Sequence, residues 1–362
     1  MAVVAAAFSN ETDQFALLAF KGQITNDPLQ ALSSWNDSLH FCKWQGVKCI
    51  RRHERVVALN ISQMDLKGLL APHIANLTFL RHINLRGNKF HGSIPQDIGW
   101  GIPINITQCS ELRRINVGRN SIVGEIPVEL SSLPKLTILY LHSNKLVGSI
   151  PPFGNISSLT KLWLNQNSLH GSIPVDLCQI PNLKVLQVSE NKLSGIITSQ
   201  LYNLLSMRTF NVMNNLFSGR IPPDIGLTLP NLENLYMAGN QFTGPIPRSL
   251  GNASRLEILD LPDNKFINLK GGLPESVANL LTQLAIITMS KNQIFGSIPN
   301  GIGNLVSLTE LAIDQNLMTG SIPVSIGKLQ RLQILDLSRN RFSGSSPYSN
   351  GNISLQSELY LC

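Results

Sequence analysis

The sequence of 362 residues is poor in charge and in aromatic rings: Asp, Glu, Lys and Arg together account for 14%, and aromatic residues for 6%. With 43% apolar residues, this composition excludes an intrinsically disordered chain. There is no run of about 20 apolar residues, the length that crosses a bilayer. The net charge of +7 is modest and both signs are mixed, so a nucleic-acid partner is not expected.

Catalytic signatures are also missing. The chain has no glycine-rich phosphate loop, no H-R-D or D-F-G, no G-x-S-x-G and no H-E-x-x-H motif. Its His and Cys residues are scattered, with no metal-ligand spacing apart from one close cysteine pair. The sequence therefore predicts a protein that is not an enzyme and that needs no cofactor or metal.

A repeat built around asparagine organises most of the chain. The repeated Asn residues lie mostly 24 residues apart, at Asn88, Asn120, Asn144, Asn167, Asn191, Asn215, Asn240, Asn264, Asn292, Asn316 and Asn340. Residues 136–151, Leu-Thr-Ile-Leu-Tyr-Leu-His-Ser-Asn-Lys-Leu-Val-Gly-Ser-Ile-Pro, show the common frame most clearly. Apolar residues stand at repeat positions 1, 4, 6 and 11, Asn at 9, Gly at 13 and Ile-Pro at 15 and 16, which is the leucine-rich repeat.

The repeat frame predicts a solenoid. Positions 4 and 6 share one face of a short strand, so both point into a core while position 5 points outward. One repeat cannot bury that face alone, so successive coils stack about 4.8 Å apart and form a parallel sheet on the concave side. The Asn at position 9 supplies hydrogen bonds to buried turn groups, and the Gly and Pro that follow disfavour long crossover helices.

The segment before the repeats predicts a cap. A short amphipathic helix is expected to begin with Asp13 as its N-cap and to run to Phe20, and a second helix to run over residues 28–35. Cys42 and Cys49 lie beside aromatic residues, where a disulfide would staple the cap that covers the apolar end of the first coil.

These features divide the chain into three parts. Residues 1–9 are apolar and are interpreted as the remnant of a signal peptide, residues 10–54 as the N-terminal cap, and residues 55–362 as about 12 repeats. The last repeat is incomplete at Cys362, so the chain is interpreted as a fragment or a truncated gene product. Over residues 94–112, two Ile-Pro endings occur without a strand between them, which indicates either a bulged coil or a lost segment.

The cap and the repeats together resemble the ectodomains of plant leucine-rich-repeat receptor kinases. The resemblance is carried by D-x-x-A-L-L-x-F-K from Asp13, F-C-x-W-x-G-V-x-C from Phe41 and the plant-type L-x-G-x-I-P repeat ending. R-I-N-V-G-R-N at residues 114–120 is similar to the subfamily of flagellin, elongation-factor and rice bacterial-blight receptors. The resemblance implies an extracellular, cell-surface module that binds a peptide or protein in plant immunity and recruits a shorter co-receptor kinase. It also implies that membrane contact and kinase activity belong to segments missing here.

Outward residues of the strands are the candidate ligand site. Position 5 carries aromatic residues at Tyr140, Trp163 and Tyr236, which core packing does not require, and Tyr and Trp are favoured interface anchors. Arg119 and His142 are expected beside the first two. The same face carries further basic residues towards the N-terminal end and acidic ones towards the other, an arrangement that would orient a ligand with an acidic segment. The basic residues are Arg81, His82, Arg86, Arg113, Arg114 and Lys161, and the acidic ones Asp260, Asp263, Asp314 and Asp336.

Glycosylation sequons recur at one place in the repeat. Asn76, Asn155, Asn252 and Asn352 each precede the first position of a repeat by four residues and are expected to carry glycans. The sequon at Asn60 falls on an outward strand position, where a glycan would obstruct the ligand face, and is expected to stay empty.

Two other functions fit the same sequence. Secreted plant inhibitors of polygalacturonases have a similar length and repeat, although the paired cysteines that cap their C-terminal end are missing here. A soluble decoy receptor is the other alternative.

Overall fold

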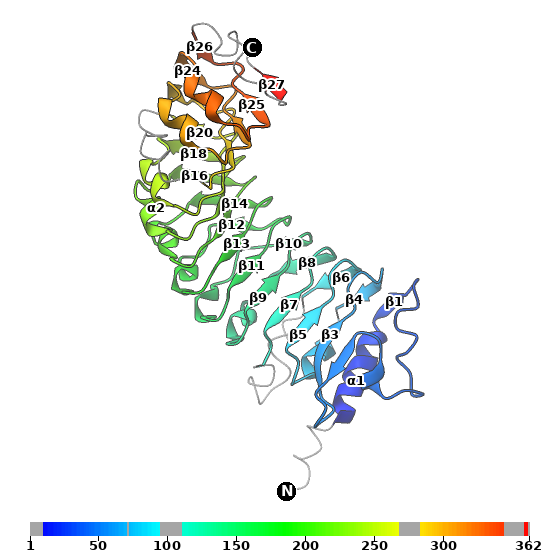
Figure 1. Ribbon diagram of the computed structural model, residues 1–362. Coiled ribbons are helices and arrows are strands. Elements are labelled where there is room, and N and C mark those ends of the chain that lie inside the picture. Colours follow the sequence, from blue (N-terminus) through cyan, green and yellow to red (C-terminus); the bar gives the residue numbers. More distant parts are fainter. Residues whose placement is uncertain (1–9, 71, 95–110, 268–282, 344–357, 361–362) are drawn as a thin grey trace. The chain divides into compact units, whose positions relative to one another are not determined.

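A computed structural model describes residues 10–70, 72–94, 111–267, 283–343 and 358–360. The chain divides into two compact units, Met1–Leu183 and Lys184–Cys362, and each is built from coils that stack side by side (Figure 1).

The first unit has a main parallel sheet with one strand from each coil. Its strands are β3 (Val56–Asn60), β5 (His82–Asn84), β7 (Arg114–Asn116), β9 (Ile138–Tyr140) and β11 (Lys161–Trp163). In the four three-residue strands β5, β7, β9 and β11, the middle residue is buried and its two neighbours are partly or fully exposed, as the alternation of strand side chains requires. Leu139 and Leu162, at repeat position 4, are 0% exposed and form the core beneath the sheet.

The coil that contains the irregular segment 94–112 keeps its place in this sheet. Strand β5 pairs directly with β7, with His82 opposite Arg114 and Asn84 opposite Asn116. The 32 residues between Asn88 and Asn120 therefore add one strand to the main sheet, as a repeat of normal length does. The second Ile-Pro, at residues 102–103, lies outside the described residues.

A second parallel ladder runs along the same coils. It contains β4 (Lys67–Leu69), β6 (Lys89–Ser93), β8 (Ser121–Glu125) and β10 (Lys145–Val147), and the short strand β12 (His170–Gly171) occupies the same repeat positions. Single 3₁₀ turns complete the coils at η3 (Pro72–Asn76), η5 (Val128–Ser132), η6 (Phe153–Asn155) and η7 (Val175–Gln179). Among the described residues of this unit, no long crossover helix follows the strands, in agreement with the Gly and Pro pattern.

The cap contains helix α1 (Asn10–Lys21), strand β1 (Ile24–Asn26), the 3₁₀ turn η2 (Phe41–Lys43) and strand β2 (Val47–Cys49). Strand β2 pairs antiparallel with β3 and so covers the first coil. The disulfide between Cys42 and Cys49 is present, with its Cα atoms 5.5 Å apart.

Two expectations about the cap are wrong. Asp13 is not an N-cap, because α1 begins at Asn10 and Asp13 is buried on the inner side of the helix. Residues 28–35 form turns rather than a helix. Gln30 has a left-handed φ of 51°, and the Asp27 carboxylate accepts the amide hydrogens of Ala31 and Leu32, which holds a turn in place of helical bonding.

The second unit repeats the plan. Its main parallel sheet contains β13 (Val185–Gln187), β15 (Thr209–Asn211), β17 (Asn234–Tyr236), β19 (Ile258–Asp260), β21 (Ile286–Thr288), β23 (Glu310–Ala312), β25 (Ile334–Asp336) and β27 (Glu358–Tyr360). Its other ladders contain β14 (Lys192–Ile196), β16 (Leu216–Arg220), β18 (Gln241–Gly244), β20 (Lys265–Phe266), β22 (Phe295–Gly296), β24 (Leu317–Gly320) and β26 (Arg341–Phe342). The turns opposite are η8 (Ser199–Asn203), η9 (Arg248–Asn252), η10 (Asn300–Asn304), η11 (Val324–Lys328) and one turn of α-helix, α2 (Ile225–Thr228).

The Asn at repeat position 9 joins neighbouring coils. The amide nitrogen of Asn292 donates to the carbonyls of Met289 and Ser290 in its own coil and to that of Leu261 in the preceding coil, each at 3.1 Å. Its side-chain oxygen accepts the backbone amide of Phe266, also in the preceding coil, at 3.0 Å. Each such Asn therefore satisfies buried backbone groups of two coils.

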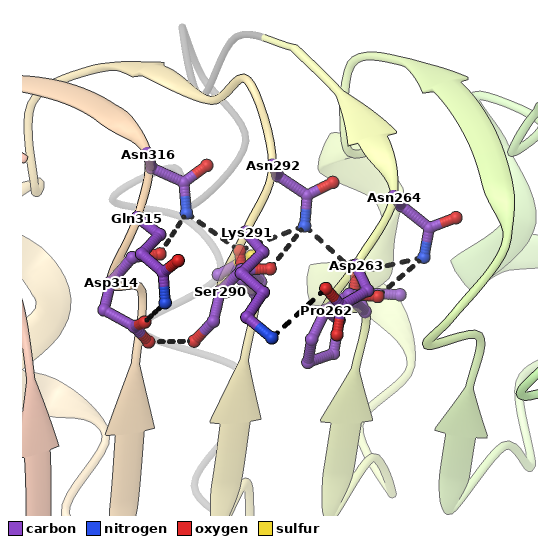
Figure 2. A network of polar contacts seen from close by, with 11 residues as sticks. Pro262, Asp263, Asn264, Ser290, Lys291, Asn292, Asp314, Gln315 and Asn316 are labelled. Atoms are coloured by element: carbon purple, nitrogen blue, oxygen red, sulfur yellow. Dashed lines mark hydrogen bonds and ion pairs between the residues drawn. The ribbon is translucent and has the colours of Figure 1, made fainter. Parts of the chain in front are cut away.

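Figure 2 shows this arrangement for the successive residues Asn264, Asn292 and Asn316. Polar residues beside them link the same turns: Lys291 pairs with Asp263 at 3.5 Å, and the Ser290 hydroxyl donates to the Asp314 carboxylate.

Candidate ligand-binding site

Two aromatic residues that the sequence singled out are in contact on the outward face of the first unit's main sheet. Tyr140 ends β9 and Trp163 ends β11, and the parallel register places them opposite each other. Their rings stack with centroids 4.4 Å apart and an interplanar angle of 25°. Such a pair presents a large apolar area at little conformational cost, which suits an interface anchor.

His142 closes this cluster from the side. Its ring meets Tyr140 and Trp163 edge-on, with centroid distances of 6.1 and 5.6 Å. The imidazole lies against the backbone of Gly118 in the neighbouring coil, where a Cβ would come within 2.3 Å of the ring. Position 118 therefore has to be Gly for His142 to occupy this place.

The buried position of His142 has an electrostatic consequence. Only 6% of the residue is exposed, and burial, together with the positive charges of Arg86 and Arg119, lowers the pKa of its imidazole to about 4. The ring is thus neutral at pH 7. Its Nδ1 atom is buried without a hydrogen-bond partner, and so is Nε1 of Trp163. Buried polar atoms without protein partners are rare in native proteins.

Arg119 is held beside the cluster by the turn. Its backbone amide donates to the carbonyl of His142 at 2.8 Å, and its φ of 56° is the left-handed conformation that this turn position adopts throughout the repeats. Its side chain is exposed. The structure thus brings together four of the expected site residues: Tyr140, Trp163, His142 and Arg119.

Tyr236, the fifth expected residue, belongs to the second unit. It ends β17, between Asn211 of β15 and Asp260 of β19. Burial raises the pKa of its phenol, and the negative charges of Asp260 and Glu257 raise it further. The ring contacts of the aromatic cluster join Tyr140, His142 and Trp163 and do not include Tyr236.

Sequence reasoning missed Gly118 as part of the site. The sequence does contain a signal for this contact: Gly118 stands at repeat position 7, and His142 stands at the same position of the next coil. A small residue beside a large one at the same position of adjacent coils indicates that the large side chain lies over its neighbour.

Three of the expected glycosylation sites share one structural position. Asn76, Asn155 and Asn252 are each the last residue of a 3₁₀ turn, at η3, η6 and η9. Asn155 and Asn252 are exposed and Asn76 is half-buried. Asn352 lies outside the described residues. Asn60 instead ends β3 on the strand face, where its side-chain oxygen accepts a hydrogen bond from Asn84 at 3.0 Å.

The described residues contain no group of three or more His, Cys, Asp or Glu side chains placed to hold a metal ion. Within the same ranges, no helix combines the length and the apolar character that crossing a membrane requires.

Comparison with known proteins agrees with this architecture. The Leucine rich repeat N-terminal domain family matches residues 10–50. The Leucine Rich Repeat family matches residues 79–100, 135–155, 158–180, 182–204, 231–253 and 331–353.

Among curated proteins, the LRR receptor-like serine/threonine-protein kinase EFR of Arabidopsis thaliana is 52% identical over 95 residues, which are 26% of this chain and 9% of that protein. A putative leucine-rich repeat receptor-like serine/threonine-protein kinase of the same plant is 35% identical over 308 residues, 79% of this chain and 30% of that protein. The matches thus span less than a third of either kinase.

Among solved structures, the plant peptide hormone receptor RGFR1 in complex with RGF2 superposes with a TM-score of 0.74 and 32% identity, over 82% of this chain and 45% of that one. The chain is therefore a leucine-rich-repeat protein whose relatives are plant leucine-rich-repeat receptor kinases.

Proposed function

We propose that this chain is the extracellular ligand-recognition module of a plant receptor kinase and that it senses a peptide or protein in immunity. The observation that carries the proposal is the stacked pair of Tyr140 and Trp163 on the outward face of the main sheet. The relatives are receptor kinases, and the RGFR1 structure is that of a peptide hormone receptor in complex with RGF2.

The proposed site binds without catalysis. Tyr140 and Trp163 supply apolar contact area, and aromatic residues of this kind dominate the binding energy of many interfaces. A buried donor without an acceptor costs about 1–3 kcal/mol. A ligand carbonyl that accepts a hydrogen bond from Nε1 of Trp163 would recover that cost.

Signalling requires partners beyond this chain. In the proposed assembly, a membrane span and a kinase domain of the whole receptor transmit the signal, and a shorter leucine-rich-repeat co-receptor kinase joins after ligand binding. The module itself lies outside the plasma membrane, where the sequons of the 3₁₀ turns would be glycosylated and the Cys42–Cys49 disulfide would persist.

A chimaera tests the proposal. The chain is joined to the membrane span and kinase of the EFR relative, expressed in leaf cells, and scored for kinase phosphorylation after treatment with fractions of microbial culture. We expect a response that is lost in the Tyr140→Ala/Trp163→Ala variant and kept in a control, Val123→Ala/Val147→Ala, which alters two exposed residues of the second ladder. Thermal unfolding is measured for each secreted variant to verify folding.

Three outcomes would overturn the proposal. The first is a response that the aromatic variant leaves undiminished, and the second is the lack of a response to every fraction. The third is inhibition of a polygalacturonase by the secreted chain, which would favour the inhibitor alternative.

A further inference from the structure

We infer that the ligand of this surface carries an acidic peptide segment, which lies over β5 and β7 beside the aromatic pair. The inference rests on the proposed function and adds the chemical class of the ligand and its direction along the coils.

The first observation is the placement of the charges. Five arginines gather on or beside the outward face of two neighbouring coils: Arg81, Arg86, Arg113, Arg114 and Arg119. Arg113 and Arg114 donate their backbone amides to the carbonyl of Arg81, at 2.8 and 3.1 Å, which fixes three arginines at the start of two adjacent strands. Arg86 and Arg119 lie at the other end of the same strands, close enough to lower the pKa of His142.

The second observation is that none of these arginines has an ion-pair partner among the described residues. Glu111 is an acidic neighbour, and it is bound to Lys135 instead. Its pKa is lowered by that hydrogen bond and, more weakly, by the charges of Lys135, Arg81 and Arg113. Like charges brought together without counter-charges destabilise a fold, so their grouping favours an external anion.

The third observation is the distribution of unsatisfied atoms. Five buried side-chain atoms of the described residues have no hydrogen-bond partner, and four of them lie along this face: Arg81 Nε, His82 Nδ1, His142 Nδ1 and Trp163 Nε1. Side chains at β5 (Arg81 and His82) and in the aromatic cluster (His142 and Trp163) therefore contain polar atoms without a hydrogen-bond partner in the described chain. Arg81 Nε is a charge-assisted donor, for which a carboxylate is the best acceptor.

The coil spacing sets the order of groups in the ligand. β7 and β11 are separated by one intervening strand, and at about 4.8 Å per strand Arg114 and Trp163 lie about 10 Å apart along the coil axis. An extended peptide advances about 3.3 Å per residue. An acidic residue over Arg113 and Arg114 therefore lies about three residues from an apolar residue over Tyr140 and Trp163.

A peptide selection tests this inference. The secreted chain is used to select from a displayed library of random short peptides, at low and at moderate salt. We expect enrichment of Asp and Glu about three positions from an apolar residue, with binding that weakens as salt rises. In the Arg113→Gln/Arg114→Gln variant, whose altered side chains are exposed, the acidic preference should disappear and the affinity of selected peptides should fall about tenfold or more.

Matched variants separate the possible causes. Lys67→Gln/Lys145→Gln removes the same charge from exposed residues of the second ladder and should leave binding unchanged. Tyr140→Ala/Trp163→Ala should remove the apolar preference and keep the acidic one. Loss of neither preference in that variant contradicts the aromatic site of the proposed function while leaving the acidic subsite standing.

The inference is overturned by selected peptides without an acidic preference, by a library that yields no binders, or by a preference that survives the arginine substitutions. Oligogalacturonate and anionic lipid vesicles serve as competing probes. Arginine-dependent binding of either probe, without binding of acidic peptides, would assign the surface to that anion and contradict the peptide.

Discussion

Arg55 and Asp13 form a buried ion pair with two hydrogen bonds, although 42 residues separate them in the sequence. Nε of Arg55 lies 3.0 Å from one carboxylate oxygen and Nη2 lies 2.8 Å from the other. The side chains are 4% and 0% exposed. Asp13 also accepts the backbone amide of Val56 at 2.7 Å, so a single carboxylate ties helix α1 to the first strand of the solenoid.

Removal of this carboxylate should destabilise the cap strongly. Asp13→Ala leaves the buried Arg55 guanidinium without a carboxylate counter-charge, which costs about 3–5 kcal/mol. Chemical denaturation of the chain, followed by tryptophan fluorescence, measures the loss. The control is Lys89→Ala, which breaks the exposed pair with Asp65 and should cost less than about 1 kcal/mol. Equal losses in the two variants would contradict a special role of the buried pair.

The Asn ladder should be the most sensitive polar feature of the coils. Asn240→Ala removes donors to the carbonyls of Val212, Met237 and Ala238 and the acceptor of the Phe217 amide. We expect a loss of about 2–4 kcal/mol, because buried backbone groups are left unpaired. Asn231→Ala removes one side-chain bond, to the carbonyl of Leu205, and should cost about 0.5–1.5 kcal/mol. Comparable denaturation midpoints for both variants would refute the ladder's importance.

The lowered pKa of His142 makes stability depend on pH. The unfolded chain takes up a proton near pH 6.5, whereas the folded chain does so near pH 4. The contribution of His142 is therefore complete above pH 6.5 and declines as the pH falls from 6.5 to 4, by at most about 3 kcal/mol.

His142→Gln should flatten this part of the stability profile, measured by urea denaturation at a series of pH values. The pKa of His82 is also lowered, by burial and by neighbouring arginines, but His82 titrates in both proteins and cancels in the difference. Parallel profiles for the two proteins would show that the imidazole of His142 titrates normally.

Glycans should occupy the ends of the 3₁₀ turns. When the chain is secreted from plant cells, we expect glycopeptide mass spectrometry to find glycans on Asn76, Asn155 and Asn252, and also on Asn352. Asn155→Gln should remove one glycan. We expect Asn60 to be empty, and a glycan there would argue against the strand face as the ligand surface.

The strand face could be predicted from the sequence because the repeat fixes it. Tyr140 and Trp163 occupy position 5 of adjacent coils, so the repeat alone places them opposite each other. The same reasoning places Arg119 and His142 nearby, since positions 7 and 8 follow directly on the strand.

Other features could not be predicted because they depend on contacts between distant residues. Asp13 pairs with Arg55, which lies 42 residues away, and the residue pattern within α1 cannot predict that pairing. The second ladder was not predicted, because residues such as Lys89–Ser93 become strands only through pairing with the next coil. Residues 28–35 form turns because the backbone of Gln30 is in the left-handed conformation, and the spacing of apolar residues does not predict that conformation.

The Asn ladder gives the solenoid a polarity. Asn292 supplies the acceptor for the Phe266 amide of the coil before it, whereas its own amide nitrogen keeps two acceptors within its own coil. Backbone bonds along the main sheet join a coil to both of its neighbours, but the side-chain acceptor of the Phe266 amide comes from the following coil. During synthesis on the ribosome, the amide that corresponds to Phe266 in each nascent coil can be bonded only after the Asn of the following coil has emerged. The coil made last is therefore always at least one hydrogen bond short of its final structure.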